Sequence, residues 1–543
     1  MRGTRSIQVT DYDVIIVGAG HNGLTAGVEL SRAGKKVLIL EKTEGPGGMA
    51  ATRELFPGYK HIVGAWALLV FREEMLKYLE LDKEGFEVIR PESSYTVFGD
   101  DGSVPFIGYR DPIDLANHMV EDHGFEAMQG FQDLASYFTA WKEVFDQYVG
   151  KPAPPIEEII AGIEDKEKRE AIAMLTFGST VEVLRKFFPD PSMAATIQGS
   201  LSASAVDGTH MGPFSKGSAA SLSYHYCAGD NYDFKIPRGG IGELSYALER
   251  VFNRYAGPLG GEVRYKNPIS HFLMEDGVVR GVQLETGESI HSRAVISTLD
   301  AYSTFVRLSD TTQLPRDFVQ SVEEIDYTNG YIQIHLTLTD LPTFTGHMAF
   351  VNDTPQAYLM AYIKSPEHLH EAWKAYKENQ VPDDPAVYFY FPSMLDPQLA
   401  PEGKHTCTLF AHYFPAEPPK GEFKAMKNQA TENMINVVEK IAPGFRDLIM
   451  DKATFTHHYF ESNFGATRGD FAQGLLHPGQ MFGDRPVANW SSEERSSYET
   501  PLKNLFMAGG GCQPGPGVTC LPGMHGGQLV LQYLESGELA KIA

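Results

Sequence analysis

The sequence has 543 residues, of which 42% are hydrophobic, and a formal net charge of −24. A chain of this length exceeds what one hydrophobic core supports, so two or more domains are expected, and its composition is that of a globular protein. The acidity argues against a nucleic-acid partner and against electrostatic docking on an anionic membrane, because both are polyanions.

Several other classes are disfavoured by simple patterns. No run of about 18 apolar residues occurs, so no membrane-spanning helix is predicted. The opening segment MRGTRSIQVTDYD lacks the apolar core of a secretion signal. The four cysteines show neither zinc-ligand spacing nor a CxxC pair, so neither a metal site nor a disulfide framework is expected. These patterns together predict a cytoplasmic protein.

A strand, a glycine-rich turn and a helix are predicted near the beginning of the chain. Residues 14–17 are apolar, and residues 23–33 follow as the expected helix. Gly18, Gly20 and Gly23 have the spacing of a dinucleotide-binding turn. In such a turn the first glycine allows the tight bend, the second lets the backbone approach a pyrophosphate, and the third lets the helix pack closely. The helix N-terminus is then expected to face the phosphates.

The second strand, residues 35–42, ends in a candidate nucleotide ligand. Glu41 lies where a carboxylate binds the ribose hydroxyls in this kind of fold, and Lys42 follows it as a further cofactor-binding candidate. An acid at this place disfavours a 2′-phosphate, so the ligand is expected to be NAD or FAD.

The next segment favours FAD. The glycine pair Gly47–Gly48 is followed by Thr52, an order that resembles the second motif of the flavin monooxygenase, amine oxidase and phytoene desaturase superfamily. The resemblance implies that the pair passes beside the ribityl chain and phosphate of FAD, and that residues 58–68 lie beside the isoalloxazine ring. Met49 stands where the family usually has a basic residue. The cofactor-binding residues implied here are Gly47, Gly48, Met49, Gly64, Ala65 and Trp66.

Two later blocks also resemble the phytoene desaturase pattern. Residues 236–301 contain a Gly-Gly turn, a helix and a short strand in which Val263 is the implied adenine contact, followed by strands with turns at 276–277 and 286–287. Residues 504–534 form a strand, a Gly/Pro-rich turn and a helix that the family brings to the flavin pyrimidine. The implied cofactor contacts in this last block are Gly510, Gly517 and Val518.

Residues 192–240 resemble one branch of this family, which includes the pyridine nucleotide-disulfide oxidoreductase domain-containing protein 2 group. No CxxxxC pair is present, so disulfide reduction is not expected. The resemblance implies an α/β fold with a Rossmann-type FAD-binding domain, of the GR2-like kind, and a discontinuous substrate domain. The FAD domain is expected to comprise residues 1–95, 230–310 and 460–543, and the substrate domain residues 96–229 and 311–459.

The two substrate-domain segments have different patterns. Residues 96–229 contain long amphipathic stretches and are predicted to be mainly helical. Residues 325–415 contain five segments with strand-like alternation, which predict an antiparallel sheet: GYIQIHLTLTD, HMAFVND, AYLMAYI, AVYFYFP and HTCTLFAHYF. In the family such a sheet forms a wall of the substrate cavity.

The resemblance implies an FAD-dependent oxidoreductase. The leading expectation is a dehydrogenase or desaturase that forms a C=C bond in a small apolar or alicyclic substrate by hydride transfer to flavin N5. Oxidation of a C–N bond by a flavin amine oxidase is the main alternative; a flavin-dependent isomerase or a non-catalytic FAD-binding protein also stays open. The electron acceptor, oxygen or a quinone, and a homo-oligomeric state are left open by the sequence.

The sequence gives only weak indications of the catalytic residues. His225 and Tyr224 precede the Gly-Gly turn in a segment that leads back towards the flavin, and they are the candidates for proton transfer. Cys512 and Cys520 are expected near the ring, mainly as bystander thiols; the alternatives are a covalent flavin link and, for Cys520 near the start of the last helix, a lowered thiol pKa. No metal-ligand cluster is predicted.

Overall fold

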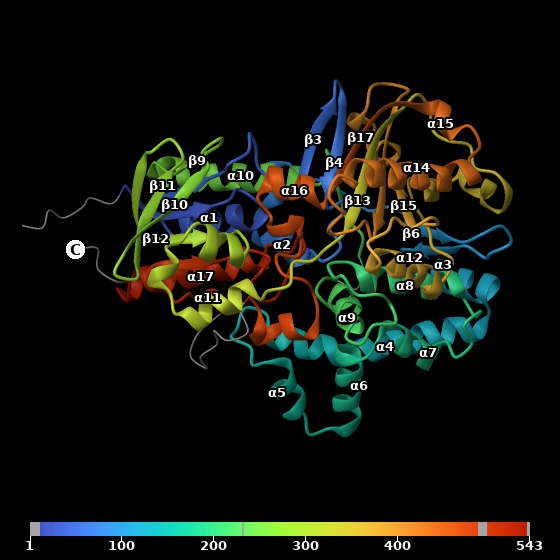
Figure 1. The fold of residues 1–543 in the computed structure, drawn as a ribbon, viewed down its shortest axis with the longest axis horizontal. Coiled ribbons are helices and arrows are strands. Elements are labelled where there is room, and N and C mark those ends of the chain that lie inside the picture. The colour runs from blue at the N-terminus through green and yellow to red at the C-terminus, as the bar shows by residue number, and fades with distance from the viewer. Residues whose placement is uncertain (1–10, 231–232, 487–496, 540–543) are drawn as a thin grey trace, which may run out of the picture.

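Two seven-stranded sheets organise the protein and lie along its long axis (Figure 1). The computed structural model describes residues 11–230, 233–486 and 497–539. Two short pairings accompany the sheets: β3 (Ala50–Phe56) with β4 (Tyr59–Gly64), and β5 (Val88–Ile89) with β8 (Ile236–Pro237). Among the helices of the described residues, none combines the length and the apolar character that crossing a membrane requires.

The first sheet has a parallel centre. Its strand order is β10-β11-β12-β1-β2-β9, and β18 also pairs with β12. β12 is parallel to β1 and β18 but antiparallel to β11. The central strands YDVIIV and VLIL are almost entirely buried, as expected for parallel strands covered on both faces. The strands are β1 (Tyr12–Val17), β2 (Val37–Leu40), β9 (Glu262–Arg264), β10 (Ile269–Glu275), β11 (Val278–Leu284), β12 (Ser289–Ser297) and β18 (Leu505–Met507).

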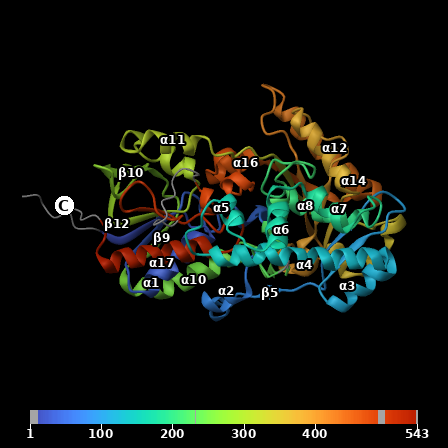
Figure 2. The same ribbon diagram turned by 90° about the horizontal axis from the view of Figure 1, so that it is seen from below.

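Three helices pack together beside the first sheet: α1 (His21–Arg32), α10 (Glu243–Ala256) and α17 (Leu521–Ser536), as Figure 2 shows. Small residues allow this close packing. A Cβ on Gly27 of α1 would lie 3.0 Å from the ring of Phe252 in α10, and one on Gly527 of α17 would lie 3.1 Å from Cα of Ala26.

The predicted antiparallel strands after α10 are confirmed. The turn from β10 to β11 contains Asp276 and Gly277, both with positive φ (51° and 72°), and Gly287 has φ 90° between β11 and β12. Glycine and aspartate tolerate the left-handed backbone that such turns need.

The second sheet is mainly antiparallel, with the order β17-β13-β16-β15-β14-β6-β7. Along β13 the side chains of Ile332 and Ile334 pack into the core shared with α14 (Phe423–Ile441), whereas Tyr331 and Gln333 face the opposite side. The strands are β6 (Ser93–Phe98), β7 (Phe106–Tyr109), β13 (Tyr331–Leu338), β14 (Leu359–Tyr362), β15 (Val387–Tyr390), β16 (His405–His412) and β17 (Ile449–Thr456).

Four of the five predicted strands between residues 325 and 415 are confirmed, and one is wrong. The segment HMAFVND lies in a 3₁₀ helix, η6 (Gly346–Asp353). Its Asn352 side chain accepts a hydrogen bond from Phe344 N (2.8 Å) and donates one to Phe344 O (2.9 Å), which closes the segment on itself instead of extending it into a sheet. The predicted domain boundary at residue 95 falls inside β6, a strand of the second sheet.

The segment 96–229 is mainly helical, as predicted, apart from β6 and β7 at its start. Figure 2 shows these helices along one side of the molecule. They are α3 (Pro112–His118), the π-helix η2 (Met119–His123), α4 (Phe125–Tyr148), α5 (Ile156–Ala161), α6 (Lys166–Phe177), α7 (Thr180–Phe187), α8 (Ala195–Val206) and α9 (Ala219–Cys227). The remaining α-helices are α2 (Glu73–Tyr78), α11 (Arg316–Glu323), α12 (Pro366–Lys377), α13 (Pro392–Leu395), α15 (Phe445–Leu448) and α16 (His457–Phe464).

Candidate functional site

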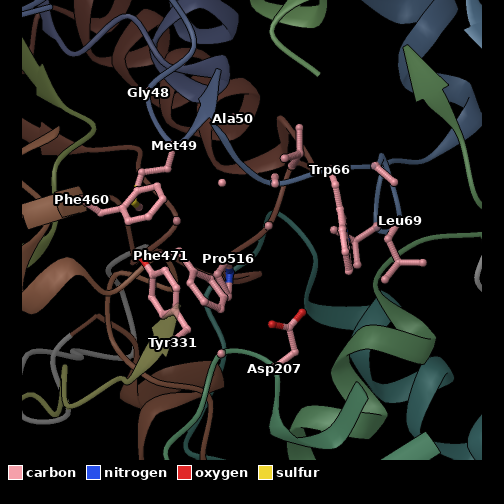
Figure 3. Close-up of a pocket in the computed structure, with 18 of the residues that line it drawn as sticks. Gly48, Met49, Ala50, Trp66, Leu69, Asp207, Tyr331, Phe460, Phe471 and Pro516 are labelled. Atoms are coloured by element: carbon pink, nitrogen blue, oxygen red, sulfur yellow. The ribbon is translucent and has the colours of Figure 1, made fainter. Parts of the chain in front are cut away.

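One cavity extends from the glycine turn of the first sheet to the inner face of the second sheet (Figure 3). Its wall includes the β1–α1 turn, the β3–β4 hairpin, α8, α9, the strands β13, β15 and β16, and the loop before α17. Of the predicted site residues, those that line it are Gly18, Gly20, Glu41, Gly47, Gly48, Met49, Gly64, Ala65, Trp66, His225, Gly510, Gly517 and Val518. Four others do not: Gly23, Lys42, Tyr224 and Val263.

The glycine turn is fixed by steric contacts at two of its three glycines. A Cβ on Gly23 would lie 2.0 Å from the carbonyl oxygen of Gly18, so α1 could not begin this close to β1 with any side chain there. Gly18 has φ +105° and abuts Thr298. By contrast, a Cβ on Gly20 would meet no heavy atom within 4 Å. That open space adjoins the first turn of α1, whose backbone N–H groups have no intrahelical partners.

His21, which the sequence reasoning did not single out, also lines the cavity. Its Nε2 atom is buried and has no hydrogen-bond partner among the described residues. Burial lowers the pKa of His21 to about 4, although a contact with the backbone of Gly517 opposes this shift. The imidazole is therefore neutral at neutral pH and offers one unused nitrogen at the helix N-terminus.

Glu41 lies at the end of β2, as predicted, and is buried. Its Oε2 accepts a hydrogen bond from Ala19 N (2.9 Å), and its Oε1 accepts hydrogen bonds from Thr43 N (2.8 Å) and Thr43 Oγ1 (2.9 Å). The carboxylate thus braces the glycine turn while lining the cavity. A carboxylate has about four acceptor positions, so it retains capacity for a ligand hydroxyl. The neighbouring Lys42 is exposed and lies outside the cavity lining.

The second glycine pair lies against the first glycine turn. Gly47 donates a hydrogen bond to the carbonyl oxygen of Ala19 (3.0 Å), and a Cβ on Gly48 would lie 3.8 Å from Cα of Gly20. Both have positive φ, 119° and 55°. The first glycine turn and the Gly47–Gly48 pair, about 30 residues apart in the chain, therefore both expose backbone atoms to the same space. A side chain at Gly20 or Gly48 would project into that space.

A side chain of the second sheet holds the β3–β4 hairpin. Gln333 of β13 accepts a hydrogen bond from Gly64 N (3.3 Å) and donates one to Gly64 O (3.2 Å). Gly64 itself has φ +88°, and a Cβ there would lie 2.1 Å from Met49 O. Ala65 and Trp66, which follow it, are thereby directed along the cavity wall. Nothing in the sequence around Gln333 marks it as a residue of this site, so it was not predicted.

The final loop is held by two residues that the sequence reasoning also missed. The Gln473 side chain donates to Thr298 O (3.1 Å) and accepts from Gly511 N (3.0 Å), so it joins the ends of β12 and β18. The buried Arg485 guanidinium donates to Gly510 O (2.9 Å) and to other backbone carbonyls. These bonds fix the backbone beside Gly510. The predicted adenine contact, Val263, pairs with β2 outside the cavity lining, and its role stays a prediction.

The structure gives Tyr224 a different role from the predicted proton transfer. Its hydroxyl is buried and donates a hydrogen bond to Pro516 O (2.6 Å), and its ring packs edge-on against Phe145. A Cβ on Gly515 would lie within 3.0 Å of this ring. Tyr224 therefore anchors α9 to the final loop, and it lies outside the cavity lining.

His225, on the same helix, does face the cavity. Its Nδ1 lies 2.9 Å from Ser221 O and its Nε2 lies 3.5 Å from Asp207 Oδ2. A carbonyl only accepts hydrogen bonds, so Nδ1 carries the hydrogen in the neutral ring and Nε2 keeps the lone pair. Asp207 also lines the cavity, and Figure 3 shows it on the side away from Gly48. Sequence reasoning missed Asp207, although it lies only 18 residues before His225.

Aromatic rings line the region between these polar groups and the glycine turns. The Trp66 ring lies 5.3 Å from that of Tyr388 and 5.9 Å from that of Phe410, measured between centroids. Tyr331 and Phe471, 5.3 Å apart, also line this part of the cavity (Figure 3). Edge-on aromatic contacts of this kind form a rigid apolar wall.

The alternative that the helix N-terminus lowers the thiol pKa of Cys520 is wrong, and the expectation of bystander thiols agrees with the structure. Cys512 and Cys520 are fully buried, and burial raises the pKa of each to about 12. Cys520 does precede α17, but it is shielded from solvent, and the loss of thiolate hydration outweighs the effect of the helix N-terminus. Among the described residues, no group of three or more His, Cys, Asp or Glu side chains could hold a metal ion.

The residues around the glycine turns fit a flavin dinucleotide. The turns leave open backbone at Gly20 and Gly48, the α1 N-terminus and the orphan nitrogen of His21 face the same space, and Glu41 has spare acceptor capacity. An anionic pyrophosphate with an adjacent ribose matches this set of donors and acceptors. The continuous cavity beyond them has room for a planar ring beside Trp66.

Comparisons with known proteins agree with this arrangement. The family model described as "Flavin containing amine oxidoreductase" matches residues 23–519. Pyridine nucleotide-disulfide oxidoreductase domain-containing protein 2 of Rattus norvegicus is 26% identical over 97% of this chain and 94% of its own length. One of the subunits of the limonene dehydrogenase of Castellaniella defragrans is 23% identical over 97% and 95%. The zeta-carotene-forming phytoene desaturase of Myxococcus xanthus is 25% identical over 93% and 90%.

A solved structure shows the same fold. An oxidoreductase from Methanosarcina mazei superposes with a TM-score of 0.59 at 16% identity, over 96% of this chain and 99% of its own. Together with the two sheets described above, this confirms the predicted α/β architecture of a Rossmann-type domain with a sheet-and-helix partner.

Proposed function

This chain belongs to the flavin-containing amine oxidoreductase family, in its phytoene desaturase-like branch, and from that premise we propose that it is an FAD-dependent dehydrogenase of carbon–carbon bonds. FAD is its cofactor, and when bound it would supply a two-electron acceptor able to take a hydride from the substrate. The substrate loses this hydride from one carbon and a proton from the neighbouring carbon, which leaves a C=C bond. Oxygen or a quinone would then take the two electrons from the protein.

The observation that carries this proposal is the continuity of the cavity. Its glycine-rich part and its aromatic part, with Trp66, Tyr388 and Phe410, form one space, so a bound flavin and an apolar molecule would share it. Aromatic walls favour substrates that are largely apolar, because burying hydrocarbon surface is favourable. The limonene dehydrogenase and the phytoene desaturase named above carry apolar substrates in their names.

His225 is the proposed proton acceptor. His225 lines the cavity, and its Nδ1 is bonded to Ser221 O, so in the neutral ring Nε2 is the nitrogen that would take the proton. Asp207, 3.5 Å away, would stabilise the imidazolium that forms when Nε2 takes the proton. Tyr224 anchors helix α9 through its hydrogen bond to Pro516 O, and Ser221 O holds Nδ1 of His225 on the same helix. These two contacts fix the position of the His225 ring.

Oxidation of a C–N bond is the second candidate. The observation that favours it is Asp207 itself, since a carboxylate that lines the cavity beside aromatic rings can hold an ammonium group. Both candidates are FAD-dependent oxidations and differ in the substrate.

The experiment that separates them is anaerobic reduction of the purified protein in a stopped-flow instrument. Cyclic ketones, terpenes and polyenes form one arm, and primary and secondary amines the other. Flavin bleaching by the first arm, with an alkene product, supports carbon–carbon dehydrogenation. Rapid bleaching by amines alone overturns it in favour of amine oxidation, and no reduction by either arm rejects both.

A further inference from the structure

The end of the cavity around Asp207 is polar. We call Asp207, His225, Tyr388 and His412 the Asp207 end. α8 contributes a face at helical spacing, with Ser200, Ala203, Ser204 and Asp207 all lining the cavity. Across from it, Tyr388 of β15 and His412 of β16 line the cavity as well, and the charge of Asp207 acts on both. Figure 3 shows Asp207 on the side of the cavity away from Gly48.

Two of these groups have hydrogen-bonding capacity that the protein does not use. In the described part of the chain, neither the Tyr388 hydroxyl nor either ring nitrogen of His412 has a hydrogen-bond partner, whereas His225 is bonded to Ser221 and lies beside Asp207. Burial raises the pKa of Tyr388 and lowers that of His412. Both are therefore uncharged at neutral pH, and each offers one hydrogen-bond donor.

A pure hydrocarbon would be a poor occupant of this end. It would displace water from Tyr388 and His412 without replacing the hydrogen bonds, which leaves buried polar groups unpaired. A ligand oxygen, as an acceptor, would restore both bonds. An ammonium group would need the Asp207 carboxylate, which already faces His225 at 3.5 Å.

We infer that the Asp207 end binds a neutral oxygen atom, of a carbonyl or hydroxyl group, on an otherwise apolar substrate, through hydrogen bonds donated by Tyr388 and His412. This inference rests on the proposed function and names its substrate class. A carbonyl placed there lies next to His225, and hydrogen bonds to its oxygen make the protons on the adjacent carbon more acidic.

The test measures binding, separately from turnover. The FAD-loaded protein is titrated with cyclohexanone and with methylenecyclohexane, which differ only in C=O against C=CH₂, and with cyclohexanol and cyclohexylammonium. The dissociation constant is read from the change in flavin absorbance and from the thermal shift. Cyclohexanone is expected to bind about 5–150-fold more tightly than methylenecyclohexane, the range that two neutral hydrogen bonds supply.

Variants assign this selectivity to the two donors. Tyr388→Phe and His412→Leu should each weaken cyclohexanone by about 2–10-fold and leave methylenecyclohexane unchanged, and His412→Gln should restore part of the loss because glutamine keeps a donor. Tyr302→Phe is the matched control, since Tyr302 contacts Arg307 outside the cavity lining. Retained FAD and an unchanged unfolding temperature confirm that each variant is folded.

The outcomes separate this inference from the proposed function. Equal binding of ketone and hydrocarbon, or ketone affinity unchanged in both Tyr388→Phe and His412→Leu, overturns the inference even if a hydrocarbon reduces the flavin. Tightest binding of cyclohexylammonium, lost in Asp207→Asn, also overturns it. Selective ketone binding that depends on both donors, without flavin reduction by any carbon substrate, upholds the oxygen site and rejects the dehydrogenase.

Discussion

Replacing Gly20 with valine should separate cofactor binding from folding. Gly20 is the N-cap of α1, with φ −72° and ψ 173°, an extended conformation that a β-branched residue adopts readily. A Cβ at this position would meet no heavy atom of the protein within 4 Å. The free energy of unfolding of the apoprotein should therefore change by no more than about 0.5 kcal/mol.

The same side chain should weaken FAD strongly. The space that valine would fill adjoins Gly48 and the first turn of α1, where the pyrophosphate is expected. Inserting carbon atoms into a filled site costs about 1–3 kcal/mol, which corresponds to FAD binding about 5–150-fold weaker.

Two glycine variants serve as matched controls. Gly23→Ala brings a Cβ to 2.0 Å from Gly18 O and should destabilise the apoprotein by about 1–3 kcal/mol as well as lose FAD. Gly257→Ala meets no atom within 4 Å and has helical φ, so neither property should change. FAD affinity is measured by titrating the apoprotein, and stability by urea unfolding. Full FAD content with wild-type affinity in Gly20→Val would refute the placement of the phosphates.

Further predictions concern single side chains. Glu41→Ala should weaken FAD by about 1–3 kcal/mol in calorimetric titration, because the ribose loses a charged acceptor; an unchanged affinity would contradict this role. His225→Ala should keep its FAD but slow anaerobic flavin reduction by about 10²–10⁴-fold, and a normal rate would dismiss it as the base. Cys512 and Cys520, with pKa values raised to about 12 by burial, should resist iodoacetamide at pH 8 in the native protein and react once it is unfolded in urea. Burial raises the pKa of Asp470 from 3.8 to about 6, so the native state holds this proton more tightly than the unfolded state. Protonated Asp470 therefore adds to the free energy of unfolding below about pH 4, and this contribution is lost as the pH rises through 6. The free energy of unfolding of Asp470→Asn, measured in urea across this pH range, should lack this pH dependence.

Local patterns predicted the strand, glycine turn and helix at the beginning of the chain. The spacing of Gly18, Gly20 and Gly23 and the acid at Glu41 place the turn, because short-range steric and charge requirements determine it. The strand prediction for residues 347–353 failed because the alternation of apolar residues cannot reveal the side-chain bonds of Asn352 that curl the segment.

Residues that act across the fold were not predictable in the same way. Gln333, Gln473 and Asp207 each contact groups brought near them by tertiary structure, and their surrounding sequence has no distinctive pattern. The opposite error arose for Tyr224, whose chemical type and position suggested proton transfer although the fold commits its hydroxyl to Pro516 O. Burial likewise rules out the lowered thiol pKa that was the alternative for Cys520. A residue type indicates which chemistry is available, and the environment decides whether it is used.

The double hydrogen bond between Gln333 and Gly64 has a consequence for how ligands exchange. It ties the second sheet to the hairpin that continues from the nucleotide-binding half, so any hinge motion that opened the cavity between them would break both bonds. Two such bonds cost about 1–3 kcal/mol, which makes the opened arrangement about 5–150-fold rarer than the closed one. An exchange route through an opening between the hairpin and the second sheet is therefore available for only a small share of the time, and these two bonds help to set that share.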